Sequence, residues 1–432
     1  MSEELNVGFK VKTIDGRVAT VQKRIGGGGQ GDVYLVSYNN SPMALKWYKK
    51  SIMNNPQAFY ENLVDNKEHG SPSAEFLWPV DVTEWIDGTF GYIMPLKPKG
   101  FYEVSDFMLT NVRFKSYKIA IDAALKIVSA YRLLHNDGYS YQDLNDGNFF
   151  INPQNGKVLI CDNDNVAPDK TETGIIGKPR YMAPEIVMKK NMPNSLSDLF
   201  SMSVILFILF CMTHPLEGKK SLEPCLSPAL QEKLYGSEAL FIMDPTNRAN
   251  GPHPIVHKNV NIVWPCLPKY MQDLFLKAFS QKALANPNAR PKELEWIQNL
   301  VRFRSEIVRC SCGNEVFTQD GKPCVCEKCH EKIKVPFRLE FSDYSIPGMP
   351  DSRIYRCQLG VCRADEALKP MGRVIAKKDN PGMLGVRNLS DKSWNAVTPS
   401  GKAKHVMPDE IVPLKDGISF VNGDEKICIK SN

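Results

Sequence analysis

Three side chains with oxygen atoms suited to metal or proton chemistry lie close together in the sequence. Asp143 and Asn148 stand five residues apart, and Asp162 follows the apolar, strand-like stretch 158–160. Carboxylate and carboxamide oxygens are ligands that Mg²⁺ accepts, and a carboxylate can take a proton from a hydroxyl group. On its own, D-x-x-x-x-N is better explained as a surface turn with an asparagine cap. The neighbouring motifs decide between the two interpretations.

A glycine-rich stretch, GGGGQGDVY at residues 26–34, lies between two stretches that favour β-strands. It fits the pattern G-x-G-x-x-G-x-V, and the matching residues are Gly26, Gly28, Gly31 and Val33. Glycine is needed where the main chain approaches phosphates closely and adopts dihedrals that a Cβ would forbid. Flexible linkers are also glycine-rich. This stretch, however, precedes MALK at residues 43–46, which resembles the V-A-I-K strand motif.

The motifs resemble those of eukaryotic-like, bacterial-type Ser/Thr protein kinases. YQDLNDGN at residues 141–148 is similar to the catalytic loop H-R-D-L-x-x-x-N, and DND at 162–164 is similar to D-F-G; both are degenerate. GKPRYMAPE at 177–185 is similar to G-T-x-x-Y-x-A-P-E, and NPNARP at 286–291 to D-P-x-x-R-P. The resemblance implies an α+β, two-lobed protein-kinase-like fold over about residues 7–300.

This resemblance implies an ATP-dependent enzyme that transfers the γ-phosphate to Ser/Thr hydroxyls of protein substrates. Asp143 would accept the proton of the attacking hydroxyl, and Asn148 and Asp162 would hold Mg²⁺ against the phosphates. Lys46 would contact the α- and β-phosphates. A pseudokinase that binds nucleotide and acts as a signalling scaffold is the alternative, because several motif positions are altered.

The resemblance also implies the contacts that would hold ATP. The glycine loop would cover the phosphates, and Lys46 would pair with Glu61, or alternatively Glu68, from the helical stretch that begins at residue 56. Met94 would be the gatekeeper. The hinge would follow it, with the main chain of residue 96 or of Lys97 contacting adenine, because Pro95 has no N–H to donate.

Two altered positions indicate how the enzyme would differ from the family pattern. Gln142 replaces the arginine that docks a phosphorylated activation loop, so the chain resembles a non-RD kinase. Asn145 replaces a phosphate-contacting lysine, which predicts a slower enzyme. The supporting residues that the resemblance implies are an ion pair between Glu185 and Arg290, a bracing Asp198 below the catalytic loop, and a structural His135.

Two close cysteine pairs follow the kinase-like part. Cys310 and Cys312 are separated by a polar insert of hairpin length from Cys326 and Cys329. This spacing predicts a small zinc ribbon over residues 305–338 with structural Zn²⁺, because four thiolates give a closed tetrahedral site. Free or redox-active thiols are the alternative, and Cys324 and His330 are spare ligands.

The remaining sequence predicts a C-terminal all-β domain over residues 353–432, after a linker at 340–352 that contains prolines and a glycine. Gly372-Arg373, VRNLS at 386–390 and VPLKDGISF at 412–420 resemble parts of a forkhead-associated (FHA) domain, and this FHA-like sandwich implies a phosphoprotein or docking partner. A match for the S-R-x-H-A element is missing. A noncatalytic docking module is therefore the expectation.

Composition limits the other functional classes. The net charge of +6 is too small and diffuse to predict a nucleic-acid partner, and 43% hydrophobic residues suffice for a sizeable core. The apolar run from residue 199 to 212 is too short to cross a bilayer and predicts a buried helix. No membrane partner is expected, and twelve cysteines suit a reducing, cytoplasmic location. By analogy, we also expect a protein substrate and a cognate protein phosphatase.

Overall fold

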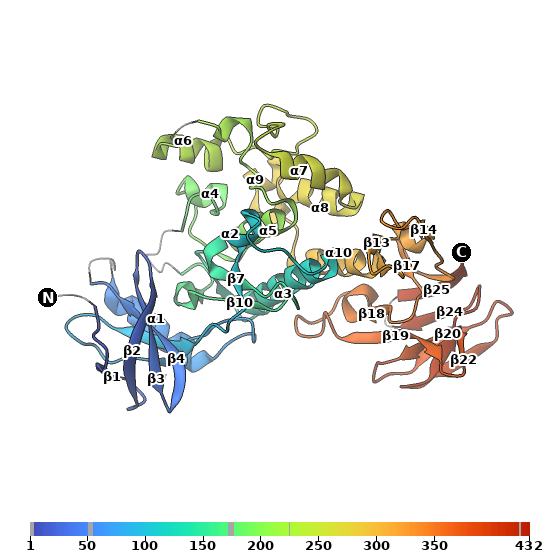
Figure 1. Cartoon of the computed structure of the whole chain (residues 1–432), viewed down its shortest axis with the longest axis horizontal. Helices are drawn as coiled ribbons and strands as arrows, with labels where there is room; N and C mark the ends of the chain where they lie inside the picture. The colour runs from blue at the N-terminus through green and yellow to red at the C-terminus, as the bar shows by residue number, and fades with distance from the viewer. Residues whose placement is uncertain (1–3, 51–54, 172–176, 224, 423–424) are drawn as a thin grey trace. The chain divides into compact units, whose positions relative to one another are not determined.

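The computed structural model describes residues 4–50, 55–171, 177–223, 225–422 and 425–432 (Figure 1). Contacts within the chain divide it into two compact units. The first contains residues 1–114, 130–267 and 272–291, and the second contains residues 115–129, 268–271 and 292–432. Among the described residues, no helix has both the length and the apolar character needed to cross a bilayer.

The first unit begins with a six-stranded antiparallel sheet, blue in Figure 1, whose strand order is β1-β2-β3-β4-β6-β5. Its strands are β1 (Lys10–Lys12), β2 (Val18–Gly27), β3 (Gly31–Tyr38), β4 (Ser41–Tyr48), β5 (Asp81–Val82) and β6 (Gly91–Pro95). Alternate residues of a strand point to opposite faces. Leu45 and Trp47 of β4 therefore pack into one apolar cluster, while Ala44 and Tyr48 pack into another.

Helix α1 (Pro56–His69) covers the second of these faces. Asn55 caps its N-terminus by accepting a hydrogen bond from the main-chain N of Ala58, and Pro56 occupies the first turn, where no N–H is needed. Phe59 and Leu63, four residues apart, are buried against the sheet in the cluster that contains Tyr48. Lys46 lies between Ala44 and Tyr48 on the same strand, so it shares this face.

The rest of the first unit is mainly helical, with short strand pairs that carry the loops of interest. One three-stranded sheet has the order β10-β9-β7, and β8 pairs with β11. The strands are β7 (Tyr102–Glu103), β8 (Tyr139–Ser140), β9 (Phe149–Ile151), β10 (Val158–Ile160) and β11 (Ala167–Pro168). The 3-10 helix η1 (Asp146–Asn148) precedes β9, and η2 (Asn163–Asn165) follows β10.

The helices of this unit surround a central apolar helix, α5 (Ser195–Cys211), and residues 197–211 of α5 are all buried. The prediction of a buried helix in this run is confirmed. A capping box between Asn194 and Ser197 satisfies the first N–H groups of α5. The other helices are α2 (Val104–Met108), α4 (Pro184–Val187), α6 (Pro228–Glu232), α7 (Lys258–Val263) and α9 (Gln281–Ala285), with parts of α3 (Tyr117–Asn136) and α8 (Lys269–Ala278).

The second unit contains α10 (Glu293–Glu306), two small hairpins and a sandwich of two antiparallel sheets. The hairpins are β12 (Ile307–Arg309) with β13 (Glu315–Phe317), and β14 (Cys324–Val325) with β15 (Lys332–Ile333). One sheet has the order β17-β16-β25-β24-β21-β22, and the other has the order β18-β19-β20-β23.

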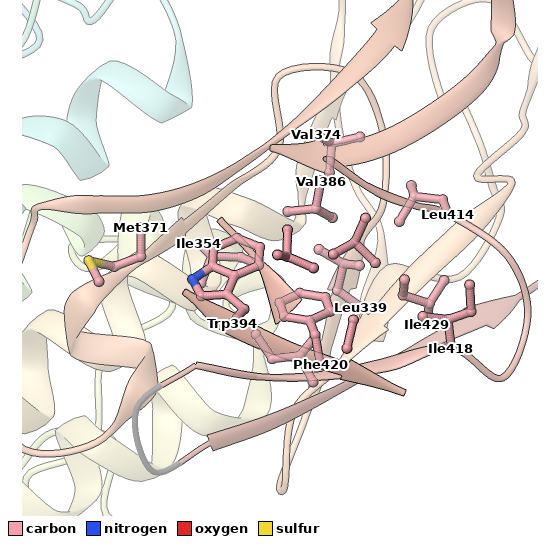
Figure 2. Packing of buried hydrophobic residues seen from close by; sticks show 14 of the residues in the cluster. Leu339, Ile354, Met371, Val374, Val386, Trp394, Leu414, Ile418, Phe420 and Ile429 are labelled. Atoms are coloured by element: carbon pink, nitrogen blue, oxygen red, sulfur yellow. The ribbon is translucent and has the colours of Figure 1, made fainter. Parts of the chain in front are cut away.

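The strands of the larger sheet are β16 (Phe337–Glu340), β17 (Ser345–Pro347), β21 (Trp394–Val397), β22 (Ala403–Val406), β24 (Ser419–Asn422) and β25 (Glu425–Ser431); those of the smaller are β18 (Arg353–Tyr355), β19 (Pro370–Lys377), β20 (Asn380–Asn388) and β23 (Ile411–Pro413). Both sheets contribute to one apolar core (Figure 2). Trp394 and Phe420 stack within it, with their ring centres 4.9 Å apart. Val386 of the opposite sheet is fully buried in the same core.

Two predicted boundaries are corrected by these contacts. The sandwich begins at β16, which pairs with β25, so residues 340–352 are not a linker and the domain does not start at residue 353. The prolines and the glycine suggested a linker, but Leu339 and Ile346 are fully buried. Helix α10 continues past the predicted boundary at residue 300 and belongs with the C-terminal unit.

Candidate active site and metal centre

Lys46 lies in the middle of β4, in register with Val33 of β3 and Tyr92 of β6. Only 5% of Lys46 is exposed. Its Nζ lies 3.1 Å from Oδ1 of Asp162 and 2.7 Å from Oδ2 of Asp164. Strand β4 therefore places the Lys46 ammonium group next to two carboxylates whose residues lie more than a hundred positions further along the chain.

The two aspartates belong to the turn that follows β10. Asp162 adopts the left-handed conformation (φ 54°, ψ 43°), and its side chain is 38% exposed. Asp164 lies in η2 with a fully buried side chain. Besides Lys46, Asp164 accepts hydrogen bonds from the hydroxyls of Tyr48, at 2.6 Å, and Tyr92, at 3.3 Å. The turn thus keeps one carboxylate partly in solvent and buries the other among three donors.

Burial and charge fix the protonation of Lys46 and of the two tyrosines near it. Burial alone would lower the pKa of Lys46, but the charges of Asp162 and Asp164 raise it above its ordinary value. Burial, and then the charge of Asp164, raise the pKa of both Tyr48 and Tyr92 well above 10. Lys46 therefore stays cationic, and both phenols keep the protons that they donate.

Asp143 and Asn148 stand at the two ends of a short loop that ends in η1. Nδ2 of Asn148 donates to the main-chain oxygen of Asp143 and to the hydroxyl of Tyr141, each at 3.0 Å. The Tyr141 hydroxyl in turn donates to the main-chain oxygen of Cys161, the residue before Asp162. Asn148 uses its amide nitrogen for both bonds, which leaves its carbonyl oxygen as the atom suited to a cation.

Burial raises the pKa of the Asp143 carboxyl to about 6, and the charge of Asp162 also raises it. Asn145 opposes this effect through a 3.3 Å hydrogen bond from its Nδ2 to Oδ1 of Asp143. Nζ of Lys178 donates to Oδ1 of Asn145 at 3.0 Å. A lysine from another part of the chain therefore stands beside the position where the sequence lacks one.

The loop that carries Asp143 is held from below by Asp198. Oδ2 of Asp198 accepts a hydrogen bond from the main-chain N of Tyr141 at 2.7 Å and lies 3.1 Å from Nε2 of His135, and its Oδ1 accepts from the main-chain N of Gln142 at 3.4 Å. The predictions that Asp198 braces this loop and that His135 is a structural hydrogen-bonding residue are confirmed.

Gln142, which stands where the family pattern has arginine, is 6% exposed. Its Nε2 donates a hydrogen bond to the main-chain oxygen of Thr171 at 2.7 Å. This contact holds the start of the segment after β11 to the loop of Asp143. The contact needs no phosphate group because its acceptor is a main-chain carbonyl.

The predicted ion pair between Glu185 and Arg290 is confirmed. Two nitrogens of the Arg290 guanidinium bind the two carboxylate oxygens of Glu185 at 2.8 and 2.7 Å. Arg290 also donates to the main-chain oxygens of Leu196, at 2.7 Å, and Ala283, at 3.2 Å. The pair is buried and ties α4 to the N-terminal end of α5 and to α9.

The glycine-rich stretch forms the hairpin between β2 and β3. A Cβ on Gly31 would lie 2.3 Å from the main-chain oxygen of Trp47, so only glycine fits at this position. A Cβ on Gly28, at the tip of the hairpin, would meet no other atom within 4 Å. Nearby, Nζ of Lys46 donates to Oε1 of Gln30 at 3.1 Å. The hairpin thus lies over the buried lysine.

The predicted gatekeeper, Met94, and the predicted hinge residue, Lys97, differ in exposure. Met94 is 7% exposed and pairs in register with Ala44, inside the apolar cluster next to Lys46. Lys97 is exposed, and its Nζ lies 4.1 Å from the centre of the Phe150 ring. The buried side chain thus lies within β6, and the exposed one follows the end of the strand by two residues.

The predicted pairing of Glu61 with Lys46 is wrong in this structure. Glu61 is exposed and accepts a hydrogen bond from Gln57, and the alternative Glu68 contacts Lys67. At about 100° per residue, Glu61 lies about 200° around the helix from both Phe59 and Leu63, which are the buried apolar residues of α1. It therefore points away from the sheet.

The sequence motifs did not predict several of the residues that surround Lys46 and Asp143. Asp164, Tyr48 and Tyr92 are separated by long stretches of sequence, and Lys178 reaches Asn145 from 33 residues away. One signal was present: an acid at position 164, where the D-F-G pattern has glycine.

In the second unit, Cys310, Cys312, Cys326 and Cys329 bring their Sγ atoms within 4.8 Å of one another. Two of the separations are 3.5 and 3.7 Å, and a tetrahedral site with Zn–S bonds of about 2.3 Å needs S–S separations of about 3.8 Å. Main-chain N–H groups that follow Cys326 lower its pKa to about 6, which favours a thiolate. The residues therefore fit Zn²⁺, and the spare candidates Cys324 and His330 lie outside this group.

The chain is similar to known protein kinases. The family model "Protein kinase domain" matches residues 19–235. Protein kinase YegI of Escherichia coli is 22% identical over 337 residues, which are 71% of this chain and 48% of that protein.

Two eukaryotic relatives match shorter parts of the chain. Maternal embryonic leucine zipper kinase of Xenopus tropicalis is 30% identical over 31% of this chain and 22% of its own length. A probable cAMP-dependent protein kinase catalytic subunit of Encephalitozoon cuniculi is 26% identical over 51% of this chain and 66% of its own. The chain thus spans about half the length of the E. coli relative and less than a quarter of the Xenopus one.

Proposed function

This chain belongs to the protein kinase domain family, and from that premise we propose that it transfers the γ-phosphate of ATP to Ser/Thr hydroxyls of protein substrates. The observation that carries the proposal is the meeting of Lys46 with Asp162, together with the Tyr141 hydroxyl that links Asn148 to the residue before Asp162. These contacts support the proposal because they bring together Lys46, the two residues that would hold Mg²⁺ and the loop of Asp143.

Each residue has a separate task in the proposed reaction. Lys46 binds the α- and β-phosphates, and the hairpin with Gly26, Gly28 and Gly31 lies over them. Asp162 and the carbonyl oxygen of Asn148 hold Mg²⁺, which neutralises phosphate charge when bound. Asp143 orients the acceptor hydroxyl and takes its proton.

Two substitutions support a non-RD type of kinase. Gln142 binds the main chain at Thr171 directly, so we propose that this contact, at the start of the segment after β11, forms without a phosphorylated residue. Lys178, exposed and next to Asn145, supplies the cation that the catalytic loop lacks. Met94 and Lys97 would border the adenine.

Phosphosite mapping by mass spectrometry tests the proposal. We expect wild-type protein incubated with Mg·ATP and a generic protein acceptor to give phosphoserine and phosphothreonine on the acceptor or on itself. Binding of ATP with no transfer, self-phosphorylation included, would instead support the nucleotide-binding scaffold.

The cysteine cluster supports a second part of the proposal, a zinc ribbon formed by the two hairpins. Four thiolates would close the coordination sphere, so the ion would be structural. Cys326, fully buried, lies in the small apolar cluster with Val308 and Val335, and the metal would join the two hairpins around that cluster.

We expect purified protein to contain one Zn²⁺ per chain, released by a chelator or by mercurial titration of the thiols. A double variant, Cys326→Ser with Cys329→Ser, should lose the metal and become sensitive to proteolysis between residues 307 and 335, because metal binding contributes folding free energy. Cys324→Ser is the matched control, because Cys324 lies on the same hairpin but is not one of the four clustered cysteines. Stoichiometric zinc in the double variant would contradict the site.

For the C-terminal sandwich we propose an FHA-like docking role. Its two antiparallel sheets and shared core support this proposal. Asn388 is fully buried, and its Nδ2 donates to the main-chain oxygens of Lys392 and Val406, which orders the loop after β20. A phosphoprotein, with a cognate protein phosphatase as a second partner, and a cytoplasmic location complete the proposal.

A further inference from the structure

Helix α1 offers no acid to Lys46. Its three acidic residues, Glu61, Asp65 and Glu68, are all exposed. The side of α1 that reaches η2 carries amides instead: Asn62 and Asn66, four residues apart, each donate Nδ2 to the main-chain oxygen of Val166 at 2.8 Å. The helix is therefore attached to the segment after β10 through neutral hydrogen bonds.

The negative charge that Lys46 meets comes from that segment itself. Asp164 has no exposed surface, and its Oδ2 lies 2.7 Å from Nζ of Lys46. The hydroxyl of Tyr48 donates to the same oxygen, and that of Tyr92 donates to the other. A carboxylate with three donors, one of them charged, is held in one position.

The two aspartates next to Lys46 differ in what else they can do. Asp162 is partly exposed, so it can turn to a metal ion, whereas Asp164 is enclosed by protein. If Asp162 were the lysine's only partner, binding of a cation would compete with Lys46 for the same carboxylate. With Asp164 present, Lys46 keeps a fixed partner while Asp162 binds the cation.

We propose that Asp164 is the positioning residue that holds Lys46 for the phosphates of ATP, in the role for which an acid of helix α1 was expected. The inference rests on the proposed function, because it concerns the lysine of that site. It follows that the orientation of Lys46 is set by the segment after β10 and by Tyr48 and Tyr92, and does not depend on where α1 lies.

The test compares Asp164→Asn, which keeps the side-chain shape and removes the charge, with Glu61→Gln and Glu68→Gln. For Asp164→Asn we expect the KM for ATP to rise roughly 10- to 100-fold, the effect of one charge-assisted hydrogen bond. The KM for the protein acceptor should not change. The two glutamate variants should stay within about twofold of wild type, since solvent-exposed changes of this kind have small effects.

Several outcomes decide the question. A roughly 10- to 100-fold loss of kcat in Asp164→Asn, with both KM values unchanged, would indicate a merely structural role and overturn the proposal. A large rise in the KM for ATP in Glu61→Gln or Glu68→Gln would also overturn it, and this arm does not depend on the folding of a buried variant.

A second measurement separates this inference from the proposed function. ATP-induced shifts of the melting temperature report nucleotide binding without any transfer. If wild type binds Mg·ATP but transfers nothing, the kinase proposal fails. In that case the inference stands only if Asp164→Asn loses the ATP-induced shift and Glu61→Gln retains it. If transfer occurs and both variants keep the shift, the inference alone fails.

Discussion

Asp143→Asn is expected to lower the rate of phosphate transfer by roughly 100- to 10,000-fold, the usual contribution of a positioned acid or base. The variant keeps the shape of the side chain and removes its ability to take a proton. ATP binding should persist because Lys46 and Asp162 are unchanged. Radiolabelled phosphate transfer to a generic acceptor measures the rate, and the ATP-induced melting shift measures binding.

The pH dependence of the rate gives an independent check of the same residue. Burial raises the pKa of the Asp143 carboxyl to about 6, and only the ionised form can accept a proton. The rate should therefore rise as the pH increases through about 6 and level off above it. In Asp143→Asn the residual rate should lack this rise.

Asp137→Asn is the matched control, since Asp137 is an exposed acid shortly before the same loop. It should keep wild-type rates. Transfer by Asp143→Asn within tenfold of wild type would show that the base lies elsewhere and would remove the main support for the proposed mechanism.

Arg290→Met should destabilise the first unit by about 3–5 kcal/mol, because it leaves the buried charge of Glu185 without its partner. The main-chain oxygens of Leu196 and Ala283 would also lose their donor. Urea unfolding of the full chain, followed by tryptophan fluorescence, measures the loss.

The double variant Glu185→Gln with Arg290→Met should recover part of this free energy, since no unpaired charge remains buried. Arg248→Met, at an exposed arginine of the same unit, should change stability by less than about 0.5 kcal/mol. A loss below 1 kcal/mol in Arg290→Met would mean that the pair contributes little to the fold.

Sequence patterns were sufficient where each residue sits in its own local motif. Glu185 and Arg290 are about a hundred residues apart, yet each was recognisable from its neighbours, and the structure joins them. Lys46 and Asp162 were found in the same way and are in contact. The buried helix α5 followed from its unbroken apolar run.

Patterns failed where the answer depends on which way an element faces. Glu61 lies in a helix that was predicted correctly, but its position around that helix directs it to solvent. Asp164 looked like a lost glycine, because its partners Tyr48 and Tyr92 lie on two strands that meet only in the folded sheet. The start of the sandwich at β16 was hidden for a related reason: its pairing partner, β25, is the last strand of the chain.

The bond from Gln142 to the main-chain oxygen of Thr171 has a consequence for how this segment can vary. Every amino acid brings the same carbonyl group to position 171, so the threonine side chain there can be exchanged without losing the acceptor. Phosphorylation or dephosphorylation of the side chain at position 171 leaves that oxygen unchanged. The contact contains no charged group. A regulator that breaks it would therefore have to move the main chain at position 171, for example by binding to that segment.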